Sequence, residues 1–195
     1  MKAIFLTLAS IVFSLNLSAQ ASESQHLLFK GVPIDGTMND YVAKMKLNGF
    51  VVVATEPGAT MLQGDFASYK KCLIGVVTMQ QKDLVSKIRV MFPEQKEWAP
   101  LYADYSNLKE MLTQKYGATT ETIEEFRTHP NVKDEGFKFL YVSSGECNYN
   151  TVFETPNGKI SLYLDHSQFE CFVSLIYLDK INGEIIKAKA IDDLW

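Results

Sequence analysis

A cysteine and a histidine on the two arms of a predicted hairpin are the side chains best placed for nucleophilic chemistry. The segment Pro156-Asn157-Gly158-Lys159 separates two β-like runs. Asn-Gly between such runs predicts a type I′ turn, because both central residues of that turn need a positive φ. The resulting register puts His166 opposite Tyr149 and Cys147 on the same face. A cysteine beside a histidine can act as an activated thiolate nucleophile.

Three observations favour a structural role for this pair. Cys147 is two residues from the position that faces His166, the flanking segment 143–146 matches no catalytic motif, and no third group is evident to orient the imidazole. We therefore expect Cys147 to be a partly buried thiol at a strand end, with His166 capping the loop. No catalytic residue is predicted, and a thiol-dependent enzyme that uses Cys147 and His166 is the alternative hypothesis.

Other catalytic and cofactor chemistry has no support in residue spacing. His26, His129 and His166 are scattered, without H-x-x-x-H or C-x-x-C spacing, so no metal site is predicted. The chain has no P-loop, no dinucleotide fingerprint and no nucleophile elbow, and we expect no cofactor. With 19 basic and 23 acidic residues the net charge is −4, and no basic run exceeds Lys70-Lys71. This balance argues against a nucleic-acid partner.

The three cysteines, Cys72, Cys147 and Cys171, allow at most one intrachain disulfide. The alternative is that all three are small buried apolar side chains. The hairpin register places Cys147 and Cys171 on strands that flank a third one, roughly 9–10 Å apart, which is too far for a bridge. If a disulfide forms, Cys72 is therefore expected to be one of its partners.

The first half of the chain predicts one helix and four strands. Thr37 is the expected N-cap of a helix over 37–48, and Gly49 is its expected end. Apolar runs and alternating patterns then predict strands at 50–55, 60–67, 71–79 and 84–92.

The second half predicts helices first and strands afterwards. An amphipathic helix should run from Trp98 to Tyr116, followed by a short helix over 120–127. Strands are expected at 137–143, on both arms of the hairpin and at 170–178, with a closing helix over 181–194. The pattern indicates an α+β protein whose antiparallel sheet carries its helices on one face. Residues 22–195 would form a single domain, and its halves, 29–95 and 96–195, would be a degenerate α-β4 duplication.

Helices on one face of a sheet would leave the opposite face open. Lys87, Arg89, Gln63 and Asp65 are the residues that we expect on that face. An exposed sheet face of mixed polarity can bind a partner, and the alternative is an ordinary solvated face.

The first residues have the pattern of a secretory signal peptide. Met1-Lys2 supplies a positive start, residues 3–17 are largely apolar, and Ala19-Gln20-Ala21 is an A-x-A cleavage signal. The apolar stretch is shorter than a spanning helix needs. No cysteine follows the cleavage region, so we expect no lipid anchor, no transmembrane segment in the mature chain, and a periplasmic or extracellular location.

Several segments spread along the chain carry a family resemblance: 29–37, 47–50, Gly64-Asp65-Phe66, Trp98, Lys115-Tyr116-Gly117, Gly158-Lys159-Ile160 and 177–182. In these segments the chain resembles a group of uncharacterised exported proteins of gut Bacteroidetes. No activity is assigned to that group, so the resemblance implies export and supplies no functional residue. The α-β4 order is also similar to that of small envelope inhibitor modules of the β-lactamase-inhibitor type, a likeness of fold that does not establish function.

These observations favour an exported envelope protein that binds an envelope protein or a glycan through its open sheet face without catalysis. The thiol enzyme described above is one alternative. The other is a structural subunit of an envelope assembly.

The export hypothesis predicts where the mature chain begins. Full-length protein expressed in a bacterium should be recovered outside the cytosol with its N-terminus near Ser22. Replacing Ala19 and Ala21 by Arg removes the small residues of the cleavage site, so that variant should keep residues 1–21. Intact-mass measurement and N-terminal sequencing distinguish the two forms. Recovery of unprocessed wild-type chain free in the cytosol would contradict export.

Overall fold

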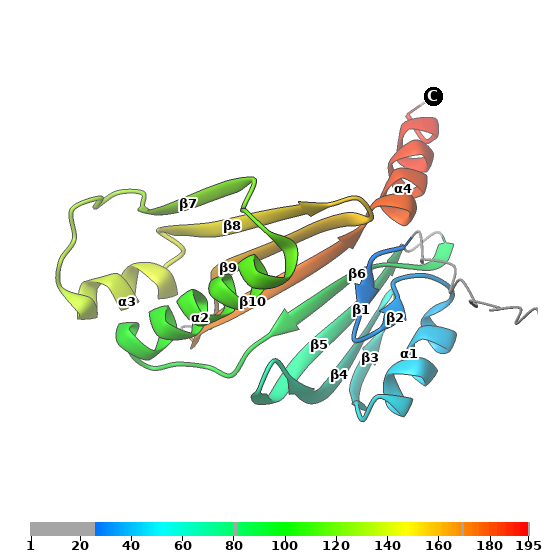
Figure 1. Cartoon of the computed structure of the whole chain (residues 1–195), viewed down its shortest axis with the longest axis horizontal. Helices are drawn as coiled ribbons and strands as arrows, with labels where there is room; N and C mark the ends of the chain where they lie inside the picture. The colour runs from blue at the N-terminus through cyan, green and yellow to red at the C-terminus, as the bar shows by residue number, and fades with distance from the viewer. Residues whose placement is uncertain (1–25, 80–81, 169, 195) are drawn as a thin grey trace, which may run out of the picture.

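The computed structural model describes residues 26–79, 82–168 and 170–194 (Figure 1). Within these ranges the chain forms four helices, an eight-stranded antiparallel sheet and a separate two-stranded sheet. The α+β class predicted from the sequence is therefore confirmed. The predicted signal peptide lies outside the described residues.

The first half of the chain follows the predicted order of elements. A short hairpin of β1 and β2 precedes α1, and four consecutive strands follow: β1 Leu28–Phe29, β2 Val32–Pro33, α1 Met38–Leu47, β3 Val51–Glu56, β4 Ala59–Phe66, β5 Tyr69–Met79 and β6 Lys82–Met91. The Thr37 side chain accepts a hydrogen bond from the Asp40 backbone N–H, which confirms the predicted N-cap. Gly49 follows the helix with a φ of 87°, a conformation that glycine adopts readily.

The second half contains three helices and four strands. They are α2 Trp98–Tyr116, β7 Glu121–Phe126, α3 Glu135–Ser143, β8 Cys147–Thr155, β9 Gly158–Ser167, β10 Glu170–Asp179 and α4 Lys180–Asp192. The predicted long helix and closing helix are thus present. Gly117, with a φ of 85°, ends α2 as expected.

The eight strands form one continuous sheet in the order β3-β4-β5-β6-β10-β9-β8-β7. Each half contributes four strands that are consecutive in sequence, and the last strand of each half lies at the centre of the sheet (Figure 1). There β6 and β10 pair antiparallel, with Ile88 opposite Tyr177 and Val90 opposite Leu175. This single pairing joins the two halves.

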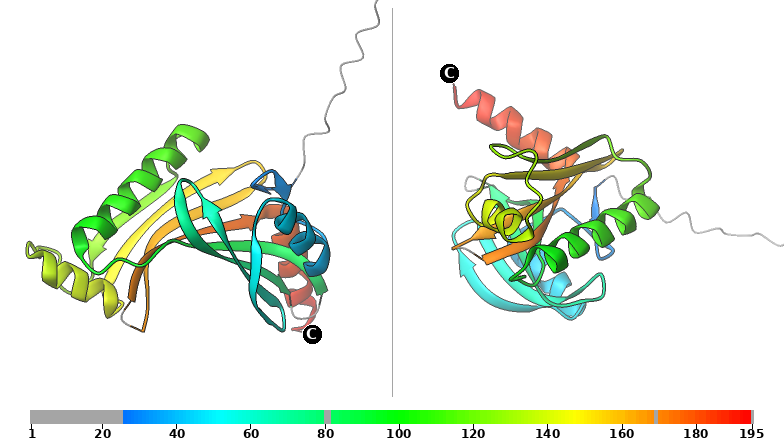
Figure 2. Two further views of the ribbon diagram at one scale, coloured as in Figure 1. Left: turned by 90° about the horizontal axis from the view of Figure 1, so that it is seen from below. Right: turned by 90° about the vertical axis from the view of Figure 1, so that its left-hand side faces the viewer.

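Helices α1 and α2 cover the same face of this sheet. The sheet is bent into an arch, and both helices lie on its outer side (Figure 2). Helix α1 contacts β4, β5 and β6, and α2 contacts β8, β9 and β10. The Tyr105 hydroxyl of α2 lies 2.7 Å from the Thr151 hydroxyl of β8 in a buried hydrogen bond. The core therefore fills the layer between these helices and the sheet.

Two predicted elements of the second half have the opposite structure. Residues 120–127 were expected to be helical, but Glu121–Phe126 is the edge strand β7, paired along its whole length with β8. Residues 137–143 were expected to be a strand, but Glu135–Ser143 is helix α3. The Asp134 side chain caps this helix by accepting a hydrogen bond from the Phe137 N–H at 3.1 Å. Residues 121–126 thus take the sheet position beside β8, and tertiary pairing and capping override the local propensity of both segments.

The hairpin between β8 and β9 is present, but its register differs from the prediction by two residues. Thr155 pairs with Gly158, so Pro156 and Asn157 form the turn, and neither Asn157 nor Gly158 has a positive φ. The predicted type I′ turn is therefore wrong, because proline at the first central position holds φ negative. Glycine is needed at position 158 for another reason: a Cβ there would collide with the backbone oxygen of Leu178.

A buried carboxylate fastens the start of the described chain to the end of β10. Asp179 accepts hydrogen bonds from the Leu27 N–H at 2.7 Å and from the Asn182 N–H at 2.8 Å. The Asn182 side-chain amide in turn donates to the backbone oxygens of Ile34, at 3.0 Å, and Val85, at 2.9 Å. These bonds tie the N-terminal segment, β6 and α4 together at one end of the sheet.

Removing the Asn182 side chain should destabilise the fold. Asn182→Ala leaves two buried carbonyl oxygens without a donor, so the free energy of unfolding should fall by about 1–3 kcal/mol. Denaturant unfolding followed by circular dichroism measures the change. Asn131→Ala, at an exposed loop position, is the control and should change stability by less than about 0.5 kcal/mol. Equal stability of the two variants would show that the amide contacts contribute little.

Candidate binding face

The face of the sheet opposite α1 and α2 is not covered by either helix, and we call it the open face. Its residues follow from the strand registers, because side chains directly opposite each other point to the same side. One row across the centre of the sheet consists of Met61, Gly75, Arg89, Ile176, Ser161 and Val152. The predicted candidates Lys87 and Arg89 both belong to this face.

A hollow of about 340 Å³ lies on the open face over the strands of the first half, and we call it the β3–β6 hollow. Its lining includes Ala54, Ala59, Met61, Gly75, Val77 and Met91. Lys87, Arg89 and Glu56 line the same hollow. Methionine side chains are flexible and polarisable, so a surface built on two of them can adapt to an apolar group.

Arg89 is held in place by residues of the second half. Its guanidinium forms an ion pair with the Asp165 carboxylate of β9, and the Ser174 hydroxyl of β10 donates to the same carboxylate at 2.8 Å. The Arg89 Nε is buried and makes no hydrogen bond within the described residues. The Arg89 Nε–H is therefore a buried donor whose hydrogen-bonding capacity is unused within the described residues, which is energetically unfavourable.

Gln63 and Asp65, the other two predicted candidates, lie away from the β3–β6 hollow. They line a different hollow near the end of α1, beside Lys71. The Asp65 carboxylate accepts hydrogen bonds from the Lys70 side chain at 2.6 Å and from the Lys71 N–H at 3.2 Å. The bond from Lys70 lowers the pKa of Asp65. The structure thus brings Lys87 and Arg89 together and separates them from Gln63 and Asp65.

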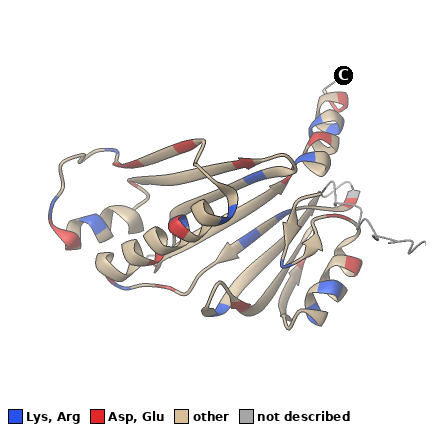
Figure 3. Cartoon of the chain, viewed as in Figure 1, with Lys and Arg blue, Asp and Glu red and all other residues tan. Residues whose placement is uncertain are grey.

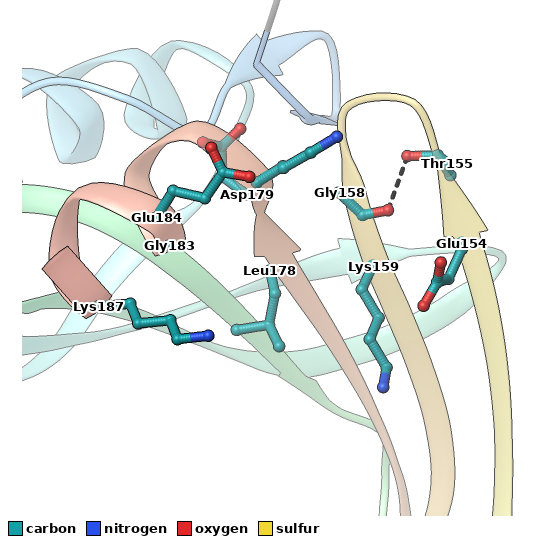
Figure 4. A pocket seen from close by; sticks show the side chains of 10 residues that line it. Glu154, Thr155, Gly158, Lys159, Leu178, Asp179, Gly183, Glu184 and Lys187 are labelled. Atoms are coloured by element: carbon teal, nitrogen blue, oxygen red, sulfur yellow. Dashed lines mark hydrogen bonds between the residues drawn. The ribbon is translucent and has the colours of Figure 1, made fainter.

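A second hollow, of about 300 Å³, lies where α4 meets the ends of β8, β9 and β10, and we call it the α4 hollow. Figure 4 shows Lys187 of α4 and Leu178 of β10 pointing toward each other, with Lys159 and Glu154 on the neighbouring strands. No motif or spacing in the sequence marks these residues as a site. Alternation along β9 and β10 could have placed Lys159 and Leu178 on the open face, but Lys187 depends on how α4 is oriented.

Cys147 and His166, the residues of the alternative thiol-enzyme hypothesis, do not pair with each other in the sheet. In the sheet Cys147 pairs with Phe126 of β7, whereas His166 pairs with Cys171 of β10. His166 is exposed, and its imidazole lies against Gly145: a Cβ added at that glycine would be 3.0 Å from the His166 Nε2. No hydrogen bond joins Cys147 to His166 among the described residues, so the imidazole is not positioned as the base of this thiol.

All three thiols are free in the structure. Burial raises the pKa of Cys147 to about 12 and those of Cys72 and Cys171 to about 11. A raised pKa disfavours the thiolate, which is the nucleophilic form. The environment of Cys147 therefore opposes the chemistry that the alternative hypothesis requires.

Comparison with models of known protein families, with curated proteins and with solved structures gives no match for this chain. In the part of the chain that the structure describes, no three His, Cys, Asp or Glu side chains form a group able to hold a metal ion. None of the described helices combines the length and apolar character needed to cross a membrane.

The thiol environments predict slow alkylation of the folded protein. Because the ordinary thiol pKa is 9.0, a pKa of about 12 lowers the thiolate fraction of Cys147 near neutral pH roughly a thousandfold. Iodoacetamide should therefore label Cys147 slowly at pH 8 and rapidly after denaturation, as measured by peptide mass spectrometry. Rapid labelling of Cys147 in the folded chain would support the alternative hypothesis of a thiol-dependent enzyme.

The same shifts set the direction of the pH dependence of stability. The unfolded thiols ionise near pH 9 and the folded ones only near pH 11 to 12. Their contribution to stability is therefore complete below about pH 9 and is lost as the pH rises. The urea midpoint should fall between pH 8 and pH 10.5, and it should fall less in a variant with Cys72, Cys147 and Cys171 all replaced by Ala.

Proposed function

We propose that this chain is an exported, non-catalytic binding module that holds a protein partner on its open face. The observation that carries the proposal is the β3–β6 hollow, an apolar depression with two methionines on a sheet face that α1 and α2 leave uncovered. Contiguous apolar surface that remains exposed in a folded domain is typical of interaction sites.

The dimensions of the open face suit a protein interface. Eight strands spaced by about 4.8 Å give a sheet roughly 34 Å wide along its surface. A standard interface buries about 800 Å² on each partner, which a face of this width can provide. The arched sheet would place a protruding segment of the partner against strands of both halves (Figure 2).

The lining of the β3–β6 hollow favours a protein over a glycan. A glycan presents many hydroxyl groups, and each needs a hydrogen bond once water is removed. Six of the residues that line the hollow, Ala54, Ala59, Met61, Gly75, Val77 and Met91, offer no polar side-chain group. An apolar side chain of a protein partner gains more free energy at such a surface than a sugar does.

Cross-linking in living cells tests this proposal. A photoactivatable amino acid placed at Met61 lies in the hollow, whereas the same amino acid at Ala43 lies on the exposed side of α1. Illumination of the native host should give a protease-sensitive adduct from position 61 and none from position 43. Adding Gly75→Phe should fill the hollow and remove the adduct, while Ala43→Phe should leave it unchanged.

The Gly75 variant is expected to fold. A Cβ at Gly75 would make only ordinary contacts, the nearest with Arg89 at 3.8 Å, and glycine inside a strand is itself destabilising. Circular dichroism and thermal unfolding check this point. Equal adducts at positions 61 and 43 would reject the open face, a protease-resistant adduct would reject a protein partner, and an obligate oligomer by size exclusion would favour the structural-subunit alternative.

A further inference from the structure

We propose that the open face recognises a short acidic segment of its protein partner, whose carboxylates lie among Lys87, Lys159 and Lys187 while an adjacent apolar side chain rests on Leu178. This inference rests on the proposed function and specifies the chemistry of the partner. The three lysines come from three different elements, β6, β9 and α4, and Figure 3 shows basic residues on each of these elements.

The lysines lie around one exposed leucine on the open face, near the end of the central strand β10. In the sheet Leu178 of β10 is directly opposite Lys87 on one side and Lys159 on the other. Lys187 of α4 extends toward the same leucine (Figure 4). Leu178 is 39% exposed, although its neighbour Tyr177, on the opposite face, is 4% exposed. An exposed apolar side chain ringed by cations is suited to a ligand that is apolar and anionic at once.

None of these three lysines is neutralised within the described part of the chain. Lys70 and Lys109 are each paired with a carboxylate, at 2.6 Å in both cases, and Arg89 is paired with Asp165. Among the described residues Lys87, Lys159 and Lys187 take part in no such ion pair, even though Glu154 stands directly opposite Lys159 in the sheet. Three like charges around one apolar group repel one another, and a bound anion would relieve that repulsion.

The α4 hollow and the β3–β6 hollow adjoin at the paired residues Lys87 and Leu178, and we call the row of open-face residues that runs through both hollows the groove. Lys87 lines the β3–β6 hollow, Leu178 lines the α4 hollow, and the two residues are paired neighbours. From Glu56 on β3 to Glu154 on β8 the groove crosses seven strands, roughly 29 Å along the surface. An extended segment of roughly eight or nine residues spans that length.

The charges along this groove define a pattern for the ligand. Along the strands, Lys87 and Lys159 lie between Glu56 and Glu154, which stand at the two ends of the row. On the α4 side, Glu184 and Lys180 line the hollow together with Lys187. A segment with carboxylates in the middle and neutral or basic residues at both ends is complementary to this arrangement. A uniform polyanion, such as nucleic acid or a sulfated glycan, would be repelled by the glutamates at both ends of the groove. This repulsion disfavours binding of such a ligand.

Lysine rather than arginine at the centre of the groove suits a protein carboxylate. A lysine ammonium is a compact charge on a flexible stem, and it accepts an anion from many directions without bidentate geometry. Adjacent apolar surface at Leu178 and Met91 would exclude water around such an ion pair and strengthen it. Because these contacts are ion pairs, added salt should weaken binding of the acidic segment. The weakening should be largest for those lysine–carboxylate pairs that remain exposed to solvent.

Selection from a displayed library of random twelve-residue peptides tests the inference without assuming any sequence for the partner. The target is the chain purified after expression from its full-length sequence. Selected peptides should carry Asp or Glu next to Leu, Met or Phe, with acidic residues rare at the ends. A representative synthetic peptide should bind at least a hundredfold more weakly to the triple variant Lys87→Glu, Lys159→Glu, Lys187→Glu.

A matched control separates local charge from net charge. The triple variant Lys44→Glu, Lys46→Glu, Lys133→Glu changes the net charge equally at exposed positions outside the groove, and it should bind the peptide within about threefold of the wild type. The triple Lys→Arg variant of the groove keeps the charge and should retain binding within about tenfold. Circular dichroism confirms that each variant is folded.

The outcomes distinguish this inference from the proposed function. Neutral or basic peptides that are blocked by Gly75→Phe would overturn the acidic segment and leave the open face as the binding site. The proposed function and this inference would both be overturned if peptide binding is unchanged by Gly75→Phe and by the groove variants. Failure to select any peptide would overturn both as well. Acidic peptides that the control triple weakens as strongly as the groove triple would overturn the assignment to these lysines.

Discussion

The antiparallel pairing of β6 with β10 is the interaction on which the rest of the structure depends. It turns two four-stranded sheets into one, and it brings Arg89 within reach of Asp165 and Ser174 from the other half. It also sets Lys87 opposite Leu178, so that the β3–β6 hollow and the α4 hollow adjoin on the open face. A shift of this ladder by one residue would turn Lys87 and Arg89 toward the helices, where Ile88 and Val90 now pack.

The sequence was sufficient to predict the architecture where residue periodicity and capping agree. Thr37 and Gly49 marked the ends of α1, and Gly117 marked the end of α2. The two exchanged elements, β7 and α3, are short segments whose conformation is decided by their neighbours. β7 is held by pairing with β8, and α3 has β-favouring residues but begins at an Asp134 cap. The intrinsic helix and strand propensities of the residues indicate neither the pairing of β7 with β8 nor the start of α3 at Asp134.

The hairpin shows why a wrong register still gave the correct faces. The error was two residues, and side chains alternate with a period of two, so Thr151 and Leu162 were still assigned to the buried face. The binding face was predictable only in part for a related reason. Alternation along β6 places Lys87 and Arg89 on the open face. Whether Lys187 lies near Leu178, however, depends on the direction in which α4 leaves the sheet. That direction is fixed by Asp179 and Asn182 through contacts with residues far away in sequence.

The position of β10 has a consequence for when the chain can fold. The last strand of the described chain, β10, lies in the middle of the sheet between β6 and β9, so a nascent chain that ends before residue 170 leaves an edge of each of these strands unpaired. The Asp179 carboxylate that fixes the start of the described chain is also made late. The complete eight-stranded sheet can therefore form only after residues 170–179 have been synthesised. Until then the two halves lack the strand pairing that joins them.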